Sequence, residues 1–253
     1  MTANIADIAI TENAGILEIL FDRPERKNAL TASMYQAMTA ALEDAACRPD
    51  IAVVLLAGRG DSFCAGNDLG DFMAGPEGME SALAFTKVLA RFDKPVVAAV
   101  QGAAVGIGTT MLLHCDLIYA SPDARFIVPF VSLGLVPEAG SSLLLPAIIG
   151  HAKAAAMLLL GEPMTAQEAD QNGLVTAIVA AETLIDHARV KAAALAASPQ
   201  AALMTTLRLL RHDEASLLDR MDKESRLFQE ALGSVEAQRA FHAFFARKPD
   251  TSS

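Results

Sequence analysis

The sequence predicts an α/β fold with a sheet whose two faces are both covered. Three short segments, Ile51–Ala57, Val96–Val100 and Asp116–Ala120, are apolar almost throughout and have the length of strands. Strands that are apolar on both sides are typical of sheets buried between helices. From Thr183 onward, every segment has a helical pattern. We therefore expect an α/β core followed by a helical end.

The chain begins with a predicted β-hairpin. Ile8–Thr11 and Ile16–Phe21 are apolar or alternating, and Glu12-Asn-Ala-Gly15 between them has the residue types of a tight turn. Thr31 is expected to cap a helix with one apolar stripe, which ends before Pro49. The hairpin and this helix precede the first buried strand.

The next segments contain two glycine-rich loops. Gly58–Leu69 indicates a loop, and a helix is predicted over Met79–Phe92. Gly102-Ala-Ala-Val-Gly-Ile-Gly108 lies where a strand gives way to a helix over Ile107–His114. Its glycines fit neither a P-loop nor the dinucleotide-binding fingerprint, so it predicts no nucleotide site. Glycines at such a turn do let backbone N–H groups approach a ligand oxygen.

The rest of the chain is mainly helical. Helices are expected over Ser141–Ile149 and His151–Leu160, followed by one that Thr165 caps. Val175–Val179 is the last predicted strand. Three helices are then predicted: one that Ser198 caps and that ends near Arg211, one over Ser216–Leu232, and one that Ser234 caps and that ends near Arg247.

Composition and charge exclude several classes of protein. The chain of 253 residues can bury a full core, and its hydrophobic share of 53% favours additional apolar surface for a homo-oligomer. The net charge of −10 and the pI near 4.9 argue against a nucleic-acid-binding surface. No signal peptide and no apolar run of membrane-spanning length is evident, so we expect a cytoplasmic protein without a membrane partner.

The cysteines and histidines do not have the spacing of metal ligands. Cys47, Cys64 and Cys115 are widely separated and are expected to be buried free thiols. The histidines fall mainly on predicted helices and are expected to be structural or exposed.

Glu138 is the residue on which a functional hypothesis depends. It follows a stretch from Phe126 to Pro137 in which every residue except Ser132 is apolar or small. Burial in such surroundings raises a carboxyl pKa and makes the group a useful base. Alternatively, Glu138 is an acid in the first turn of a helix that opens at Pro137, where the helix dipole favours negative charge. The residues alone leave both interpretations open.

Glu138 and the two glycine loops together resemble the crotonase (enoyl-CoA hydratase/isomerase) superfamily. Phe63-Cys-Ala-Gly-Asn-Asp-Leu69 and Gly102–Gly108 each end a strand and start a helix, some forty residues apart. The resemblance extends over nearly the whole chain. It includes four further segments: Arg23–Leu30, Cys115–Ala120, Gly150–Ala155 and Ala169–Val175.

The resemblance implies a fold, an assembly and a substrate class. The fold would be a spiral of β-β-α turns over residues 1–195, followed by a helical region over residues 196–253 that forms trimers. A homotrimer or a dimer of trimers is implied. The implied substrate is an acyl-CoA thioester, in fatty acid metabolism. No metal or redox cofactor is implied, since coenzyme A is part of the substrate.

Family members bind the thioester oxygen with two backbone N–H groups, and matching the motifs places these at Asn67 and Ile107. Removal of a proton beside a thioester carbonyl puts negative charge on its oxygen, which fixed N–H dipoles stabilise. The side chains can have separate roles. Asn67 is expected to adopt a left-handed turn and Ile107 to pack in the core.

The chain departs from the hydratases of this family. Hydratases carry two glutamates around one water, and the matching positions here are Thr110 and Phe130. Neither residue can act as acid or base, so we expect hydration to be slow or absent. With Glu138, the chain looks like the peroxisomal-type 3-enoyl-CoA to 2-enoyl-CoA isomerases and their bacterial relatives. The segments that carry this likeness are Val105–Ile107, Pro129–Phe130 and Pro137–Ser142.

The implied mechanism is a proton shuttle by one base. Glu138 would remove the proton at C2, the two N–H groups would hold the dienolate, and the same carboxyl would return the proton at C4. Three alternatives remain open: isomerisation of a ring-derived (epoxide or oxepin) CoA thioester, weak hydration, and binding of acyl-CoA without catalysis.

The resemblance also assigns the residues that contact the substrate. Basic side chains would border the adenine and phosphates, and backbone would approach the ligand. The expected substrate-binding residues are Arg26, Lys27, Ala65, Gly66, Asp68, Leu69 and Phe130. Arg239, Arg247 and Lys248 would reach a neighbouring subunit's site in a trimer, or else form a solvated helix end.

Overall fold

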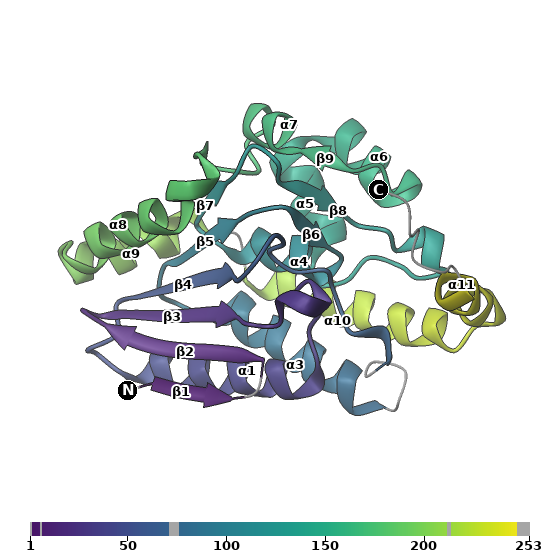
Figure 1. The fold of residues 1–253 in the computed structure, drawn as a ribbon, viewed down its shortest axis with the longest axis horizontal. Coiled ribbons are helices and arrows are strands. Elements are labelled where there is room, and N and C mark those ends of the chain that lie inside the picture. Colours follow the sequence, from purple (N-terminus) through teal and green to yellow (C-terminus); the bar gives the residue numbers. More distant parts are fainter. Residues whose placement is uncertain (1, 6, 71–75, 212–213, 247–253) are drawn as a thin grey trace.

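Two β-sheets of different size organise the chain, as a computed structural model of the protein shows (Figure 1). The structure describes residues 2–5, 7–70, 76–211 and 214–246. The large sheet comprises β1 (Thr2–Ile5), β2 (Ile8–Asn13), β3 (Ile16–Phe21), β4 (Val53–Gly58), β5 (Val96–Val100), β7 (Leu117–Ala120) and β10 (Ala177–Ile178), in that order. The small sheet comprises β6 (Ala103–Val105), β8 (Arg125–Ile127) and β9 (Met164–Thr165), in that order. The predicted α/β class is confirmed.

Helices cover both faces of the large sheet. The α-helices are α1 (Ala32–Cys47), α3 (Pro76–Arg91), α4 (Ile107–Thr110), α5 (Ser141–Ile149), α6 (His151–Leu160), α7 (Ala166–Gln171), α8 (Leu184–Ala196), α9 (Gln200–Leu210), α10 (Glu214–Leu232) and α11 (Val235–Ala246). Short 3₁₀ helices are η1 (Pro24–Arg26), η2 (Met111–His114), η3 (Val131–Leu133) and η4 (Ala181–Thr183). In Figure 1, α1 and α3 lie together behind the sheet, and α8 and α9 lie at the left.

The pleat of the central strands divides the core into two layers. Val54 and Leu56 of β4 belong to the main apolar cluster with side chains of α1 and α3. Val53 and Leu55 belong to a second cluster, formed mainly with α8. Because successive side chains of a strand point to opposite faces, the continuous apolar pattern of β4 serves both layers. β3, β4, β5, β7 and β10 pair in parallel, as such burial requires.

The parallel strands β3, β4, β5 and β7 are each followed by a short extended segment or bridge and then by a helix. β5 leads to β6 and then to α4, and β7 leads to β8. After β4, Cys64 forms a parallel bridge with Ala104 of β6, and Asn67 forms one with Leu30. This repetition is the predicted spiral of β-β-α turns. It places the second segment of each turn beside the second segment of the next.

The sequence predicted most elements correctly and missed the small sheet. Strands β6 and β8 have three residues each, too short for a periodic pattern, and β6 lies within the glycine segment that indicated a turn. Helix α3 begins at Pro76, three residues before the prediction. The prediction that Ser198 caps α9 is wrong, because its hydroxyl donates to the Ala194 carbonyl at 2.9 Å. The prediction of buried thiols is wrong for Cys47, which is exposed.

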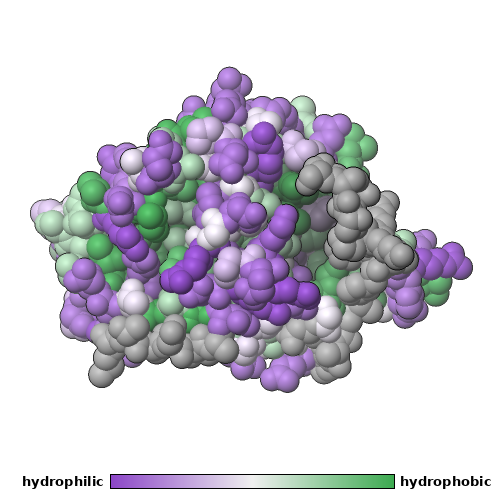
Figure 2. Space-filling view, viewed as in Figure 1, coloured by the Kyte–Doolittle hydropathy of each residue, from purple (hydrophilic) through white to green (hydrophobic). Residues whose placement is uncertain are grey.

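Apolar side chains remain at the surface on several helices. Figure 2 shows them among polar residues at the left end of the molecule, where α8 and α9 lie. Leu209 and Leu210 of α9 are 81% and 75% exposed, and Leu159, Leu160 and Val190 are also exposed. Among the described residues, no helix combines the length and the apolar character needed to cross a membrane.

Lys94 fixes the end of helix α1 against the start of β5. Thr31 caps the other end of α1 as predicted, its hydroxyl accepting a hydrogen bond from the Met34 N–H. The Lys94 ammonium donates to the carbonyls of Ala45, Arg48 and Ile51 at 2.6, 2.6 and 2.8 Å. All three of its N–H donors are therefore used on carbonyls at the C-terminal end of the helix.

We expect Lys94→Met to lower the free energy of unfolding by about 2–3 kcal/mol, because three carbonyls lose a charged donor while the apolar stem is kept. Chemical denaturation would measure the change. Lys191→Met, at an exposed position of α8, is the matched control and should change it by less than about 0.5 kcal/mol. Equal effects of the two substitutions would contradict this role of Lys94.

Candidate active site

The backbone N–H of Asn67 points away from the strand beside it. In the bridge between Asn67 and Leu30, the hydrogen bonds are donated by Leu30 to Gly66 and by Asp68 to Leu30, both at 2.8 Å. In a parallel pair, the central residue turns its own N–H to the other side. No described residue accepts a hydrogen bond from this N–H. It is therefore available to a ligand.

The backbone N–H of Ile107 is available for a different reason. Ile107 is the first residue of α4, and the first N–H groups of a helix have no partner within it. Gly106 before it has φ 55° and ψ −119°, a conformation that favours glycine, and a side chain there would point into open space. No acceptor for the Ile107 N–H is found in the described part of the chain.

Close approach of two backbone segments brings these N–H groups to the same place. Cys64 donates to Ala103 at 3.0 Å and accepts from Val105 at 2.9 Å. A Cβ on Gly108 would lie 2.4 Å from the Cys64 carbonyl oxygen, and one on Gly66 would lie 3.1 Å from that of Val105. Only glycine allows the first contact. Asn67 and Ile107 line the same cavity, as the predicted oxyanion site requires.

The side chains of the two donor residues are used structurally. The Tyr35 hydroxyl donates to the Asn67 side-chain oxygen at 2.5 Å, and Ile107 is buried in the core as predicted. The left-handed conformation expected at Asn67 is found instead at Gly66, with φ 97°. That expectation is wrong because the bridge to Leu30 keeps Asn67 extended.

A cavity of about 660 Å³ lies in front of the two N–H groups. It is large enough for a drug-sized ligand. Its apolar wall includes Phe130 and Phe228, whose rings meet edge to face at 6.5 Å, and Phe241 of α11. It brings together nine of the sequence-predicted site residues: Arg26, Lys27, Ala65, Gly66, Asn67, Asp68, Leu69, Ile107 and Phe130.

Asp68 lines the cavity, but its carboxylate also holds the loops of the cavity together. It accepts from Arg23 at 2.7 Å and from Arg26 at 3.5 Å, while its other oxygen accepts from the Gly70 N–H at 3.0 Å. The side chain of Asp68 is largely buried. Arg26 is largely exposed despite this pairing, and Lys27 is exposed.

Glu138 is not among the residues that line this cavity, and it is buried, with 6% of its surface exposed. The Thr110 hydroxyl donates to one carboxylate oxygen at 2.7 Å. Burial first, and the charge of Glu138 as a further cause, raise the pKa of Tyr35 and raise the pKa of Cys64 to about 12. The carboxylate is thus close enough to interact with both groups, which flank Asn67.

The pKa of Glu138 is raised to about 7. Burial is the largest cause, and the negative charge of Glu224 adds to it, whereas the hydrogen bond from Thr110 lowers the pKa. A carboxylate with such a pKa is a general base of useful strength near neutral pH. The alternative placement in a helical first turn does not hold, since α5 begins three residues later, at Ser141.

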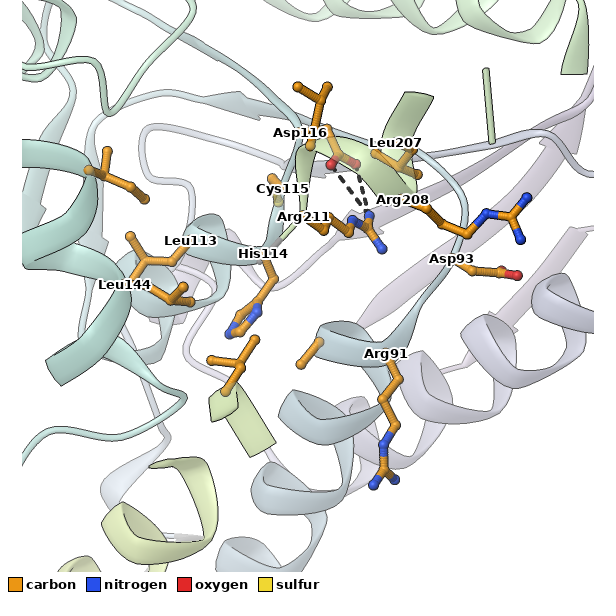
Figure 3. Close-up of a pocket in the computed structure, with 14 residues that line it drawn as sticks. Arg91, Asp93, Leu113, His114, Cys115, Asp116, Leu144, Leu207, Arg208 and Arg211 are labelled. Carbon is orange, nitrogen blue, oxygen red and sulfur yellow. Dashed lines mark hydrogen bonds and ion pairs between the residues drawn. The ribbon is translucent and has the colours of Figure 1, made fainter. Parts of the chain in front are cut away.

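A second cavity, of about 450 Å³, is lined in part by His114, whose ring contacts the turn that follows Glu138. Figure 3 shows His114 beside Leu113 and Leu144 in it, while Asp116 and Arg211 pair at 3.2 Å elsewhere in the wall. The His114 ring bonds to the Ala139 carbonyl at 2.8 Å, so its Nε2 carries the proton and donates. Burial lowers the pKa of His114 to about 4 and keeps the ring neutral.

Several residues of the site were not predicted from the sequence. Tyr35 lies in the first turn of α1 and Phe228 near the C-terminal end of α10, on helices with ordinary apolar stripes. Glu224 is one of several acids on α10, and no motif distinguishes it. Thr110 was noted only as the place of a missing acid, although a hydroxyl there can bond to a carboxylate brought close by the fold.

Comparisons with known proteins show the family of the chain. The family profile described as "Enoyl-CoA hydratase/isomerase" matches residues 11–251. Rat "Enoyl-CoA delta isomerase 2" is 38% identical over 96% of this chain, and the match spans 64% of that relative, less than two thirds of its length. "1,2-epoxyphenylacetyl-CoA isomerase" of Escherichia coli K12 is 32% identical over 92% of this chain and 93% of its own.

The fold also matches solved structures. A structure described as an enoyl-CoA hydratase/isomerase from Pseudoalteromonas atlantica T6c superposes with a TM-score of 0.91 at 39% identity, covering 97% of this chain and 100% of the other. This agreement confirms the predicted spiral fold.

We expect the free energy of unfolding of Glu138→Gln, relative to that of the wild type, to increase as the pH rises. A folded-state pKa of about 7 against an ordinary 4.5 means that the folded protein retains a proton that the unfolded chain has lost. Wild-type stability therefore falls as the pH rises from 4.5 to 7, by up to about 3 kcal/mol. Glutamine does not titrate, so the variant does not lose this stability.

Chemical denaturation at pH 5 and pH 8 would measure this effect as a difference between variant and wild type that grows with pH. Any cost of the glutamine amide itself is independent of pH and cancels. Glu182→Gln, at an exposed site, should show no such growth. A difference that stays constant would mean that Glu138 is ionised in the folded protein at pH 5.

Proposed function

The chain belongs to the enoyl-CoA hydratase/isomerase family, and from this premise we propose that it is a CoA-thioester isomerase that moves a double bond from the 3- to the 2-position of an enoyl-CoA. The observation that carries the proposal is the buried carboxylate of Glu138, with its pKa of about 7 and within electrostatic reach of Tyr35 and Cys64, in a site with two available N–H donors. One base and one oxyanion site are what a 1,3-proton transfer needs.

In the proposed reaction, Glu138 removes a proton from C2 of the substrate. The electron pair of the broken C–H bond moves toward the thioester carbonyl, whose oxygen becomes negative between the N–H groups of Asn67 and Ile107. The protonated carboxyl then returns the proton at C4, and the double bond forms between C2 and C3. The residue ends in its starting state, so one group performs both transfers.

Thr110 helps to define which oxygen of Glu138 carries the proton. Its hydroxyl occupies one carboxylate oxygen, which leaves the other for the substrate. Thr110 and Phe130 also mean that no second carboxylate stands at the positions where hydratases of the family hold water. This favours proton transfer over hydration.

A ring-derived CoA thioester is the second candidate substrate. The similarity to 1,2-epoxyphenylacetyl-CoA isomerase covers more than nine tenths of both chains, and ring opening of this kind would use the same base and oxyanion site. The apolar, partly aromatic wall formed by Phe130, Phe228 and Phe241 suits either a linear chain or a ring.

The basic residues at the cavity are proposed to bind the phosphates of coenzyme A. Arg26 and Lys27 line the cavity, whereas Arg239 lies on α11, and Arg247 and Lys248 lie outside the described residues. A homotrimer or dimer of trimers remains a proposal, favoured by the exposed apolar side chains of α6, α8 and α9.

We expect Glu138→Gln to lower the rate of 3-enoyl-CoA isomerisation on the order of a hundredfold to ten-thousandfold, because glutamine cannot carry the proton. KM should change little. For the wild type, kcat/KM should rise with pH and level off above the Glu138 pKa of about 7. Absorbance of the conjugated product would follow the reaction, with Glu182→Gln as the matched control.

A panel of 3-enoyl-CoA, 2-enoyl-CoA and ring-type CoA thioesters tests the choice of reaction. Turnover of 3-enoyl-CoA without hydration of 2-enoyl-CoA is expected. Rapid formation of 3-hydroxyacyl-CoA would show that another residue activates water. Binding of all three thioesters without turnover would leave a non-catalytic acyl-CoA-binding protein.

We expect Lys27→Ala to raise the KM for the CoA thioester several-fold at low salt, with little change in kcat, because phosphate attraction contributes equally to ground and transition states. The effect should shrink as ionic strength increases. Lys191→Ala is the control on a distant helix. The same KM for both variants at low ionic strength would assign Lys27 to the solvated surface.

A further inference from the structure

We propose that Glu224, on helix α10, is a positioning residue that holds Glu138 in place through the backbone turn that follows it. The kinetic consequence rests on the function proposed above, whereas the structural one does not.

Both carboxylate oxygens of Glu224 accept hydrogen bonds from the turn. One oxygen accepts from the Gly140 N–H at 2.6 Å and the other from the Ser142 N–H at 3.0 Å. The side chain is 5% exposed. These two donors lie at the N-terminal end of α5, where N–H groups lack helical partners. A buried carboxylate here satisfies both and is itself stabilised by them.

The turn needs such support because its conformation is unfavourable. Ala139 has φ 55° and Gly140 has φ 73°, so two consecutive residues are left-handed and one of them carries a side chain. His114 holds the Ala139 carbonyl from the other side. Glu138 comes directly before these residues. The direction in which its side chain leaves the backbone is therefore set by these contacts.

Close packing as well as hydrogen bonding connects the turn to α10. A Cβ on Gly140 would lie 2.6 Å from a methyl carbon of Leu217, which belongs to the same helix. Glu224 itself is 84 residues from Gly140 in the chain. Four residues beyond Glu224, Phe228 lines the substrate cavity, and residues four apart share one face of a helix. One helix face thus supports both the base and the cavity wall.

The charge of Glu224 acts on the same carboxyl. It contributes to the raised pKa of Glu138, after burial and against the hydrogen bond from Thr110. The other groups that face this region are the neutral His114, the hydroxyl of Tyr35 and the thiol of Cys64. Arg220 of α10 donates to the Ser142 hydroxyl at 3.1 Å.

A helix cap that only stabilises the fold would make the same hydrogen bonds. The two roles differ in what they predict for Glu138. A cap alone changes the stability of α5, and loss of its charge lowers the pKa of Glu138, but it leaves kcat unchanged at a pH where Glu138 is ionised. A positioning residue changes both the titration and the rate of proton transfer.

Glu224→Gln and Glu224→Asp test the proposal together. Glutamine keeps the length but removes the charge and one acceptor, and aspartate keeps the charge but is one methylene shorter. Asp222→Asn, an exposed acid two residues away on α10 that pairs with Lys87 at 2.6 Å, is the control for loss of one negative charge.

Two measurements are made on each folded variant. Infrared difference spectra against the corresponding Glu138→Gln protein give the pH at which the Glu138 carboxyl titrates, whatever reaction the protein catalyses. Steady-state kinetics with 3-enoyl-CoA give kcat and KM. Thermal unfolding establishes that the variants are folded.

For Glu224→Gln we expect Glu138 to titrate at lower pH than in the wild type and kcat to fall at least about tenfold at little changed KM, because small displacements of a base are costly. Glu224→Asp should lower kcat while moving the titration less. Asp222→Asn should behave as wild type.

Wild-type titration in Glu224→Gln, or wild-type kcat at a pH where Glu138 is ionised, would overturn the proposal. If that variant does not fold, Glu224→Asp decides, since unchanged kcat at the shorter reach would equally overturn it. If the wild type does not isomerise 3-enoyl-CoA, the proposed function fails, and the infrared titration still tests the role of Glu224.

Discussion

The close approach of the Cys64–Asn67 and Val105–Gly108 backbones is the constraint on which the site depends. At Gly108 a single Cβ would overlap the Cys64 carbonyl, so the contact exists only because that side chain is missing. The two segments are held together by sheet hydrogen bonds. A β-β-α spiral delivers such segments repeatedly, each ending a strand and opening a helix. The fold therefore presents to one cavity two backbone N–H groups that have no acceptor among the described residues, without any special side chain.

A second constraint comes from the buried carboxyl. Burial raises the pKa of Glu138 to about 7, and among the described residues one hydrogen bond, from Thr110, opposes this rise. This is unfavourable for stability and useful for chemistry. The surrounding core and the contacts of the following turn compensate for it. In the proposed reaction, the same burial that weakens the acid would keep water away from the dienolate.

The sequence was a good guide wherever a local pattern determines the structure. The fully apolar β4 and β5, the cap at Thr31 and the glycine loops could all be predicted, because each depends on neighbouring residues. The small sheet could not, since three-residue strands have no period to detect. The partners of Glu138 were not predictable for another reason: Thr110 and Glu224 are 28 and 84 residues from the residues they contact, and nothing local marks either of them.

The predicted boundary between core and helical end also rests on a local pattern, which does not reveal contacts between distant parts of the chain. The change to an all-helical pattern suggests a boundary near residue 195, and it describes the local sequence well. Packing does not follow that pattern, because α10 and α11 contribute Phe228 and Phe241 to the cavity, and Glu224 to the turn beside Glu138. A base held from so far along the chain is in place only once α10 has docked. Docking of the helical end is then part of assembling the site.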